Sequence, residues 1–217
     1  MPSGARSLRI DARRALIPVS LGVLAILHFV LGVPLWVVAG LAILVPLLYL
    51  ASALYVRREA PRFEDTFNRL LQVSDVKGLT ALYRSSRLLR LLAPDHWVLA
   101  RLGIILTLRG QFREAEGVLE ESWELAPKAY RLHLLGPMVR VKYELEAWGD
   151  LRALAEQWRQ RSLFPGAANV YLAAALLEQP TPEATRAREL LDEAEGSLAA
   201  TERVLCASVR ERLEALT

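Results

Sequence analysis

Side chains that could carry out catalysis are few in this 217-residue chain and lie far apart in the sequence. The histidines are His28, His96 and His133. None of them pairs with another histidine or with the single cysteine, Cys206, at the short spacing of an HExxH or CxxC metal site. A GxSxG sequence and a glycine-rich phosphate loop are also missing. We therefore expect no catalytic residue, no metal site, no cofactor and no enzymatic activity.

The other reactive side chains have ordinary structural explanations. Cys206 lies near Val204, Leu205 and Val209 on an apolar helix face, which favours a buried thiol over a reactive one. The carboxylates are concentrated in runs typical of a solvated helix surface, such as Glu114, Glu116, Glu120, Glu121 and Glu124. An enzyme whose site is assembled only in the folded chain stays open as a third hypothesis, behind the two given below.

Positive charge is confined to the two ends of a long apolar run. Residues 1–14 carry four arginines against one aspartate, and residues 57–62 carry three arginines against one glutamate. Residues 63–217, in contrast, hold 20 lysines and arginines against 22 acidic residues. A nucleic-acid-binding domain would need a basic face on this last part, so we expect no nucleic-acid partner.

The apolar run extends from Ala15 to Val56, 42 residues without one Asp, Glu, Lys or Arg. A single helix of that length would rise about 63 Å, twice the roughly 30 Å of a hydrocarbon core. Gly32, Val33 and Pro34 provide a turn, because glycine favours a helix end and proline a helix start. The sequence therefore predicts a transmembrane hairpin with spans at about 15–31 and 34–56.

The flanking arginines predict the orientation of this hairpin. Basic residues 1–14 and the basic juxtamembrane linker 57–62 both lie outside the spans, whereas the turn carries no charge. The positive-inside rule then places both termini in the cytoplasm of a bacterial inner membrane. Because the first span is short, a hairpin embedded in one leaflet remains an alternative with the same orientation. A cleaved signal peptide is disfavoured, since no small-x-small site follows Leu27.

Residues 63–217 read as successive amphipathic helices without a convincing strand, which makes the fold class all-α. Breaks are expected near Asp75–Gly78, Ala93–Asp95, Gly110, Pro127, Trp148–Asp150, Pro165–Gly166, Gln179–Pro182 and Gly196. Pairs of helices therefore recur at about 33–37 residues, a period that indicates stacked helical repeats. We expect three to four helix pairs, followed by a C-terminal capping helix at 201–216.

One segment, residues 96–127, resembles a tetratricopeptide repeat (TPR). The positions that match this family are Leu102, Gly103, Leu106, Gly110, Ala115, Leu119 and Pro127. Residues 129–165 and 168–195 match at fewer positions, and residues 63–94 match only in length and apolar periodicity. The segment 63–94 is therefore either a first repeat or a connector between the anchor and the domain.

The resemblance implies a superhelix whose concave groove is lined by the first helix of each repeat. Carried over to this chain, the candidate partner-binding residues are Trp97, Arg101, Ile104, Tyr130, His133, Arg140 and Asn169. Tryptophan, tyrosine and arginine are residue types enriched at binding hot spots. Two alternatives stay open: that Trp97 and Tyr130 pack between repeats, and that Arg140 forms a surface salt bridge.

These observations favour a membrane-anchored scaffold or adaptor for protein–protein interaction. Its expected partners are the lipid bilayer and a peptide segment or helix of another protein, which would bind in the groove on the cytoplasmic side. The second hypothesis is a structural or assembly subunit of a larger membrane complex. In that case the hairpin would pack against other transmembrane subunits, and the helical domain would serve as a rigid spacer.

Overall fold

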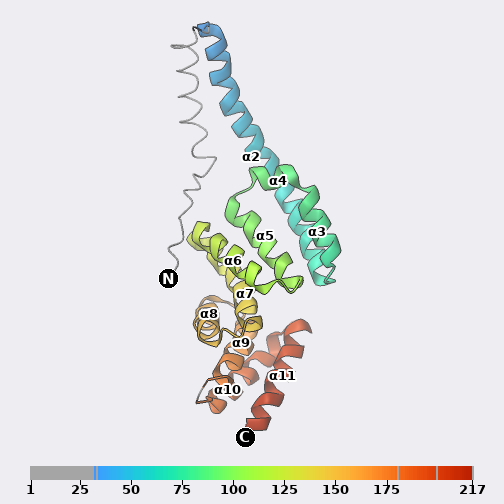
Figure 1. Cartoon of the computed structure of the whole chain (residues 1–217), viewed down its shortest axis with the longest axis vertical. Coiled ribbons are helices and arrows are strands. Elements are labelled where there is room, and N and C mark those ends of the chain that lie inside the picture. The colour runs from blue at the N-terminus through green and yellow to red at the C-terminus, as the bar shows by residue number, and fades with distance from the viewer. Residues whose placement is uncertain (1–31, 33, 180, 199, 217) are drawn as a thin grey trace. The chain divides into compact units, whose positions relative to one another are not determined.

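The structure, a computed structural model, describes residues 32, 34–179, 181–198 and 200–216, and every regular element within these ranges is helical (Figure 1). The all-α prediction is confirmed for this part of the chain. The helices are α2 (Leu35–Gln72), α3 (Val76–Ser85), α4 (Arg87–Leu92), α5 (Asp95–Leu108), α6 (Phe112–Leu125), α7 (Lys128–Glu144), α8 (Trp148–Arg161), α9 (Gly166–Leu177), α10 (Ala184–Ala194), the short 3-10 helix η1 (Glu195–Ser197) and α11 (Ala200–Leu216).

The chain divides into two compact units, Met1–Arg62 and Phe63–Thr217, and the division falls inside α2. Phe63 is also the residue at which the predicted helical domain begins. The expected linker 57–62 is not a break, because these six residues are helical and continue α2. Pro61 is tolerated within this helix, as is Pro46.

In the first unit, the described part of the apolar run is the beginning of α2. The predicted span 15–31 and the turn residue Val33 lie outside the described residues. Gly32 has a φ of +64°, in the left-handed region that glycine adopts without strain. The carbonyl of Pro34 then accepts hydrogen bonds from Val37 and Val38, which starts the helix. Among the described residues one helix, Trp36–Gln72, is long and apolar enough to cross a membrane.

In the second unit, α5 to α11 pack in two alternating layers (Figure 1). Each helix contacts the next one in the chain, from α5 on α6 through to α10 on α11. Helices α5, α7, α9 and α11 also contact one another in that order. We call these four helices the inner layer and α6, α8 and α10 the outer layer.

Helix α9 is the centre of the larger of two apolar cores. Almost all of its side chains are buried, including Val170, Leu172 and Leu176, because neighbours from both layers surround it. A helix that is apolar all round is stable only in such an enclosed position. Helix α11 completes this core with Cys206, Val209 and Leu213.

The α11 contacts bear on two expectations from the sequence. Cys206 is buried, and burial raises the pKa of its thiol, as expected of a structural cysteine. Val204, which was expected on the same apolar face, is instead 73% exposed. Val204 and Cys206 are two positions apart, which is about 200° around the helix axis. Val204 therefore points away from the core that Cys206 enters.

Most of the predicted helix breaks are present, with two differences. Ser86 separates α3 from α4, where the sequence predicted one continuous helix. Helix α8 begins at Trp148, so the preceding turn lies at 145–147 rather than at the predicted Trp148–Asp150. In that turn Glu146, not a glycine, has a positive φ of 55°. A non-glycine residue in this conformation is uncommon, and residue type alone therefore did not reveal it.

A buried lysine connects three helices on the outer side of α7. The Nζ atom of Lys142 lies 2.5 Å from Glu116, 3.1 Å from Glu120 and 3.3 Å from Asp150, which belong to α6 and α8. Burial by itself would lower the pKa of Lys142, but the hydrogen bonds to these carboxylates outweigh it and raise the pKa above its ordinary range. Lys142 therefore stays charged at physiological pH.

Helices α5 and α6 approach each other closely at Gly103. A Cβ atom at this position would lie 2.6 Å from Cγ and Cδ2 of Leu119, which is completely buried. Ala115, the other small residue of the pair, is also completely buried. The turn between the two helices uses Gly110 with a φ of +73°. Glycine is therefore required at 103 for space and at 110 for backbone conformation.

We predict that Gly103→Ala destabilises the protein by about 1–3 kcal/mol, because Leu119 must leave its packed position. Gly117→Ala is the matched control, since Gly117 is an exposed α6 residue with nothing within 4 Å of a Cβ. It should raise stability by about 0.5–1 kcal/mol through helix propensity alone. Denaturant unfolding of the full chain in detergent, followed by circular dichroism, measures both. Equal effects of the two substitutions would contradict the close packing.

Candidate partner-binding groove

The inner layer of the second unit contains a hollow of about 500 Å³, which we call the Arg140 hollow. Its walls come from the end of α2 and from α5, α7, α8, α9 and α11. The lining residues are Leu71, Ile104, Thr107, Leu108, Gly136, Pro137, Arg140, Tyr143, Glu144, Trp158, Tyr171, Glu202, Val204, Leu205 and Ser208.

A second hollow of about 370 Å³, the Glu64 hollow, adjoins the first. The two share Leu71 and Ile104, and together we call them the inner-layer groove. Residues from α2, α5 and α7 line the second hollow: Glu64, Phe67, Asn68, Leu71, Trp97, Arg101, Ile104, Tyr130 and His133.

The groove brings together six of the seven candidate residues that the sequence named. Trp97, Arg101, Ile104, Tyr130 and His133 line the Glu64 hollow, and Ile104 and Arg140 line the Arg140 hollow. These residues come from α5 and α7, whose helical periodicity places them on one face. Sequence reasoning therefore named six of the twelve groove-lining residues on these two helices.

Asn169 is the exception and does not line either hollow. It is 1% exposed, accepts a hydrogen bond from Arg159 at 3.1 Å and donates one to Glu193 at 3.2 Å. Its partners lie on α8 and α10, so Asn169 faces the outer layer. Helix α9 instead contributes Tyr171 to the groove, two residues or about 200° further around the helix.

Trp97 and Arg101 are held by a carboxylate that the sequence did not single out. Trp97 Nε1 donates a hydrogen bond to Oε1 of Glu64 at 2.6 Å. Arg101 Nε lies 3.0 and 3.1 Å from the two carboxylate oxygens of Glu64, and its Nη2 forms an ion pair with the same group. These contacts, the Glu64 clamp, fix the last part of α2 to α5. Trp97 and Arg101 therefore make contacts inside the domain. For Trp97, such packing was one of the alternatives that the sequence left open.

Aromatic rings reinforce the Glu64 clamp from both sides. The Trp97 ring packs on Phe63 with centroids 5.2 Å apart, and the Arg101 guanidinium lies 5.4 Å from the Trp97 ring centroid and 5.5 Å from that of Phe67. Such cation–π contacts add to the ion pair when the cation is partly desolvated. The clamp therefore combines charge, hydrogen bonding and apolar burial.

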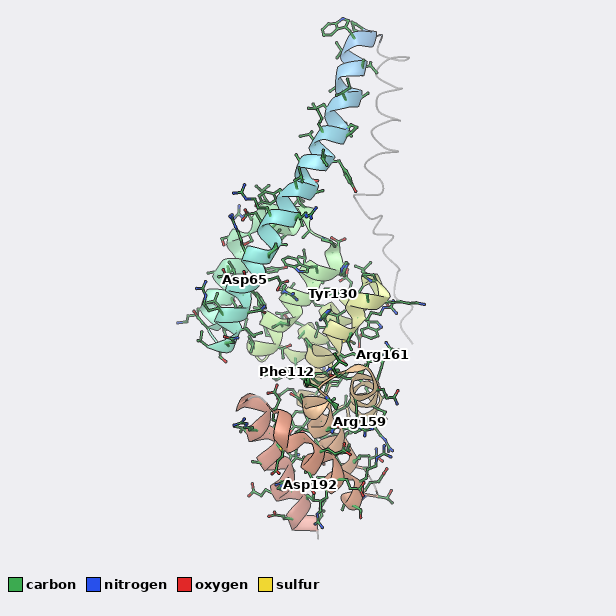
Figure 2. The ribbon with its side chains drawn as sticks, turned by 180° about the vertical axis from the view of Figure 1, so that it is seen from behind. Asp65, Phe112, Tyr130, Arg159, Arg161 and Asp192 are labelled. Atoms are coloured by element: carbon green, nitrogen blue, oxygen red, sulfur yellow. The ribbon has the colours of Figure 1, made fainter. Side chains whose placement is uncertain are left out.

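Tyr130, near the start of α7, extends the clamp within the Glu64 hollow and is labelled in Figure 2. Its hydroxyl accepts a hydrogen bond from Arg101 Nη1 at 3.4 Å. Its ring meets those of His96 and His133 at centroid distances of 4.8 and 5.6 Å. Burial raises the pKa of Tyr130 and lowers that of His96, so both are neutral at pH 7.

The Arg140 hollow has a different chemistry, with an aromatic wall and an accessible cation. Tyr143 and Tyr171 meet at a centroid distance of 5.6 Å, and Trp158 lies on the same wall. Burial raises the pKa of Tyr171 to about 12, so this ring presents a neutral hydroxyl. Arg140 is exposed, and no carboxylate among the described residues lies within 4 Å of its guanidinium. The salt-bridge alternative for Arg140 therefore has no partner in the described part of the chain.

Comparisons of the chain with protein-family models, curated proteins and solved structures find no match. Within the described residues, no group of three or more His, Cys, Asp or Glu side chains is arranged to hold a metal ion. Aromatic and aliphatic walls with a few polar groups suit the binding of a partner segment.

We predict that Glu64→Ala releases the end of α2 from α5 and destabilises the second unit by about 2–3 kcal/mol, because Arg101 and Trp97 lose their acceptor. Hydrogen exchange of the full chain should rise at residues 63–72 and in the first turns of α5. Asp65→Ala, which removes an exposed carboxylate one residue away, is the control and should leave exchange unchanged (Figure 2). Unchanged exchange in Glu64→Ala would show that apolar packing alone holds α2.

Proposed function

We propose that this protein is a membrane-anchored scaffold or adaptor whose TPR-like domain binds a segment of another protein in the inner-layer groove. The observation that carries the proposal is the Arg140 hollow. It is an apolar and aromatic depression of about 500 Å³ with an exposed arginine on its wall. Binding hot spots are enriched in tryptophan, tyrosine and arginine, the residue types gathered here.

Packing within the second unit supports the TPR-like part of this proposal. Inner-layer helices contact the next inner-layer helix as well as their own outer-layer neighbour, as expected of stacked helix pairs. The close approach of Gly103 to Leu119 and the burial of Ala115 agree with the small positions of the resemblance. A solenoid of three to four such pairs, capped by α11, is the arrangement we propose.

The chemistry of the hollow indicates what the bound segment should look like. Leu108, Pro137, Trp158 and Val204 provide apolar contacts along the wall. Arg140 lacks a carboxylate partner in the described chain and offers five N–H donors in a planar fork. We therefore propose an amphipathic helix or peptide that inserts apolar side chains and places a carboxylate opposite Arg140.

The proposed anchor is the two-helix hairpin with spans at about 15–31 and 34–56 and with both termini in the cytoplasm of a bacterial inner membrane. The exposed apolar side chains along the beginning of α2 support a membrane location for that helix. The charge pattern supports the orientation, because arginines flank the run and the turn has no charge. Anchoring would confine the groove to the membrane surface and raise its effective concentration for membrane-bound partners.

One observation favours the second function, a subunit of a larger membrane complex that binds through its hairpin. Ala39 and Ala42, three residues apart and both exposed, form a small-residue surface on α2. Such surfaces allow close packing of transmembrane helices. In this alternative the groove would be incidental to assembly.

We predict that a photo-crosslinking residue at Arg140 or at Val204 in the full-length protein captures one shared partner in native membranes. The same residue at Glu124, which is exposed on the outer-layer helix α6, should not capture it. Arg140→Glu should abolish the crosslink from position 204, because the substituted carboxylate repels the proposed acidic group of the partner.

The pattern of crosslinks separates the two functions. A partner captured equally from 124, 140 and 204 would contradict groove binding. If the partner survives Arg140→Glu but is lost when residues 15–56 are replaced by an unrelated hairpin, the subunit function is supported instead.

We predict that a fluorescent protein fused to Thr217 is active, whereas alkaline phosphatase fused there is inactive, because the C-terminus is proposed to be cytoplasmic. In a Cys206→Ala background, Val33→Cys should react with a membrane-impermeant maleimide added from outside. Active phosphatase would contradict the two-span topology. An inactive phosphatase with an unreactive Val33→Cys would indicate a hairpin confined to one leaflet.

A further inference from the structure

Helices α3 and α4 form a cationic region in an otherwise slightly acidic domain. Residues 76–92 contain four basic side chains, Lys77, Arg84, Arg87 and Arg90, and no Asp or Glu. Arg90 covers the ring of Tyr83 at 4.6 Å, but Lys77, Arg84 and Arg87 are exposed. No carboxylate of the described chain lies within 4 Å of these three cations. Their charge is therefore available to an external anion.

Two leucines stand beside this charge without protein neighbours to cover them. Leu88 is 60% exposed and Leu91 is 78% exposed, whereas Leu89 between them is buried in the domain. On a helix Leu91 lies about 40° from Arg87 and about 60° from Leu88. The outward face of α4 is therefore made of one arginine and two leucines, an amphipathic combination on a single short helix.

The cations of α3 border a shallow hollow of about 430 Å³. Lys77 and Arg84 are seven residues apart, which is two helical turns, so they lie on the same face of α3. Arg109 at the end of α5 adds a third cation, and the hollow is completed by Val76, Thr80 and Ala81. A phosphate group with an adjoining apolar portion matches this combination of groups.

We propose that Lys77, Arg84, Arg87, Leu88 and Leu91, together the α3–α4 surface, bind the headgroup region of an anionic phospholipid bilayer. In this arrangement the cations contact lipid phosphates, and the two leucines enter the outer part of the acyl chains. Surface-bound helices combine apolar insertion with attraction to anionic lipid in the same way. The inference rests on the proposed membrane anchor and adds a second attachment to it.

The observations favour lipid over a nucleic acid or an acidic protein. A nucleic acid would pair with the cations but would leave Leu88 and Leu91 exposed to water. The proposed anchor belongs to the same chain, and residues 57–72 of α2 connect it to the domain. Attachment of the domain to the membrane raises its effective concentration there, so a weak contact is sufficient for binding.

The electrostatic part of this binding can be estimated. Each lysine or arginine near an anionic membrane favours binding by about five-fold, the equivalent of about 1 kcal/mol. Neutralising Lys77, Arg84 and Arg87 together should therefore lower the bound-to-free ratio of the α3–α4 surface by about 100-fold. All three are exposed, so their replacement by glutamine leaves the core of the domain intact.

The test uses the full-length protein in a Cys206→Ala background, with Leu91→Cys labelled by an environment-sensitive fluorophore. The protein is reconstituted into vesicles of phosphatidylcholine alone or mixed with phosphatidylglycerol. We expect blue-shifted emission and quenching by spin-labelled lipid in the anionic vesicles, and loss of both in the Lys77→Gln/Arg84→Gln/Arg87→Gln variant. A label at Leu163→Cys, a loop position that is 92% exposed, is the control and should report water in every vesicle.

Three results would overturn the inference. The first is a label at position 91 that stays as water-exposed as the one at 163 in anionic vesicles. The second is quenching that persists unchanged in the triple glutamine variant. The third is a spectral shift that appears in native membranes but not in pure lipid, which would identify a protein as the occupant. Alkaline carbonate extraction separates this failure from loss of the anchor. An extracted protein contradicts membrane anchoring itself, whereas a retained protein with a water-exposed label contradicts only the α3–α4 surface.

Discussion

The interaction on which the inner-layer groove depends most is the Glu64 clamp. Helix α2 is the element in which the two units meet, and its last part is attached to the helical layers by one carboxylate that binds Trp97 and Arg101. Because this carboxylate is partly buried with its counterion, removing either group leaves the other without compensation. The clamp also occupies one side of the groove. A partner that enters beside Tyr130 would therefore contact the residues that hold α2 in place.

The positions of the two basic residues on α7 explain why an exposed arginine, Arg140, lines the groove. Lys142 and Arg140 are two residues apart and so point to opposite sides of the helix. Lys142 is buried and neutralised by carboxylates from α6 and α8, whereas Arg140 faces the groove without a carboxylate partner in the described chain. A domain with a slight acidic excess could have paired both. It uses Glu116, Glu120 and Asp150 for Lys142, and it places Glu144 and Glu202 on the walls of the hollow that Arg140 lines.

Local signals were enough to predict the helices, because these follow from periodicity and from glycine and proline, and the resemblance to a tetratricopeptide repeat named six residues that line the groove. Gly110 and Pro127 mark helix ends, and the spacing of Trp97, Ile104 and Arg140 follows the exposed face of α5 and α7. Asn169 and Val204 were misplaced because a change of two residues in register reverses the direction of a side chain. Glu64 could not be found, since its partners are 33 and 37 residues away and only packing brings them together.

The Arg140 hollow joins residues that are far apart in the sequence. Leu71 comes from the end of α2 and Val204 from α11, yet both line this hollow. Helix α11 therefore has two roles, because Cys206, Val209 and Leu213 close the core while Val204 and Glu202 form a wall of the groove.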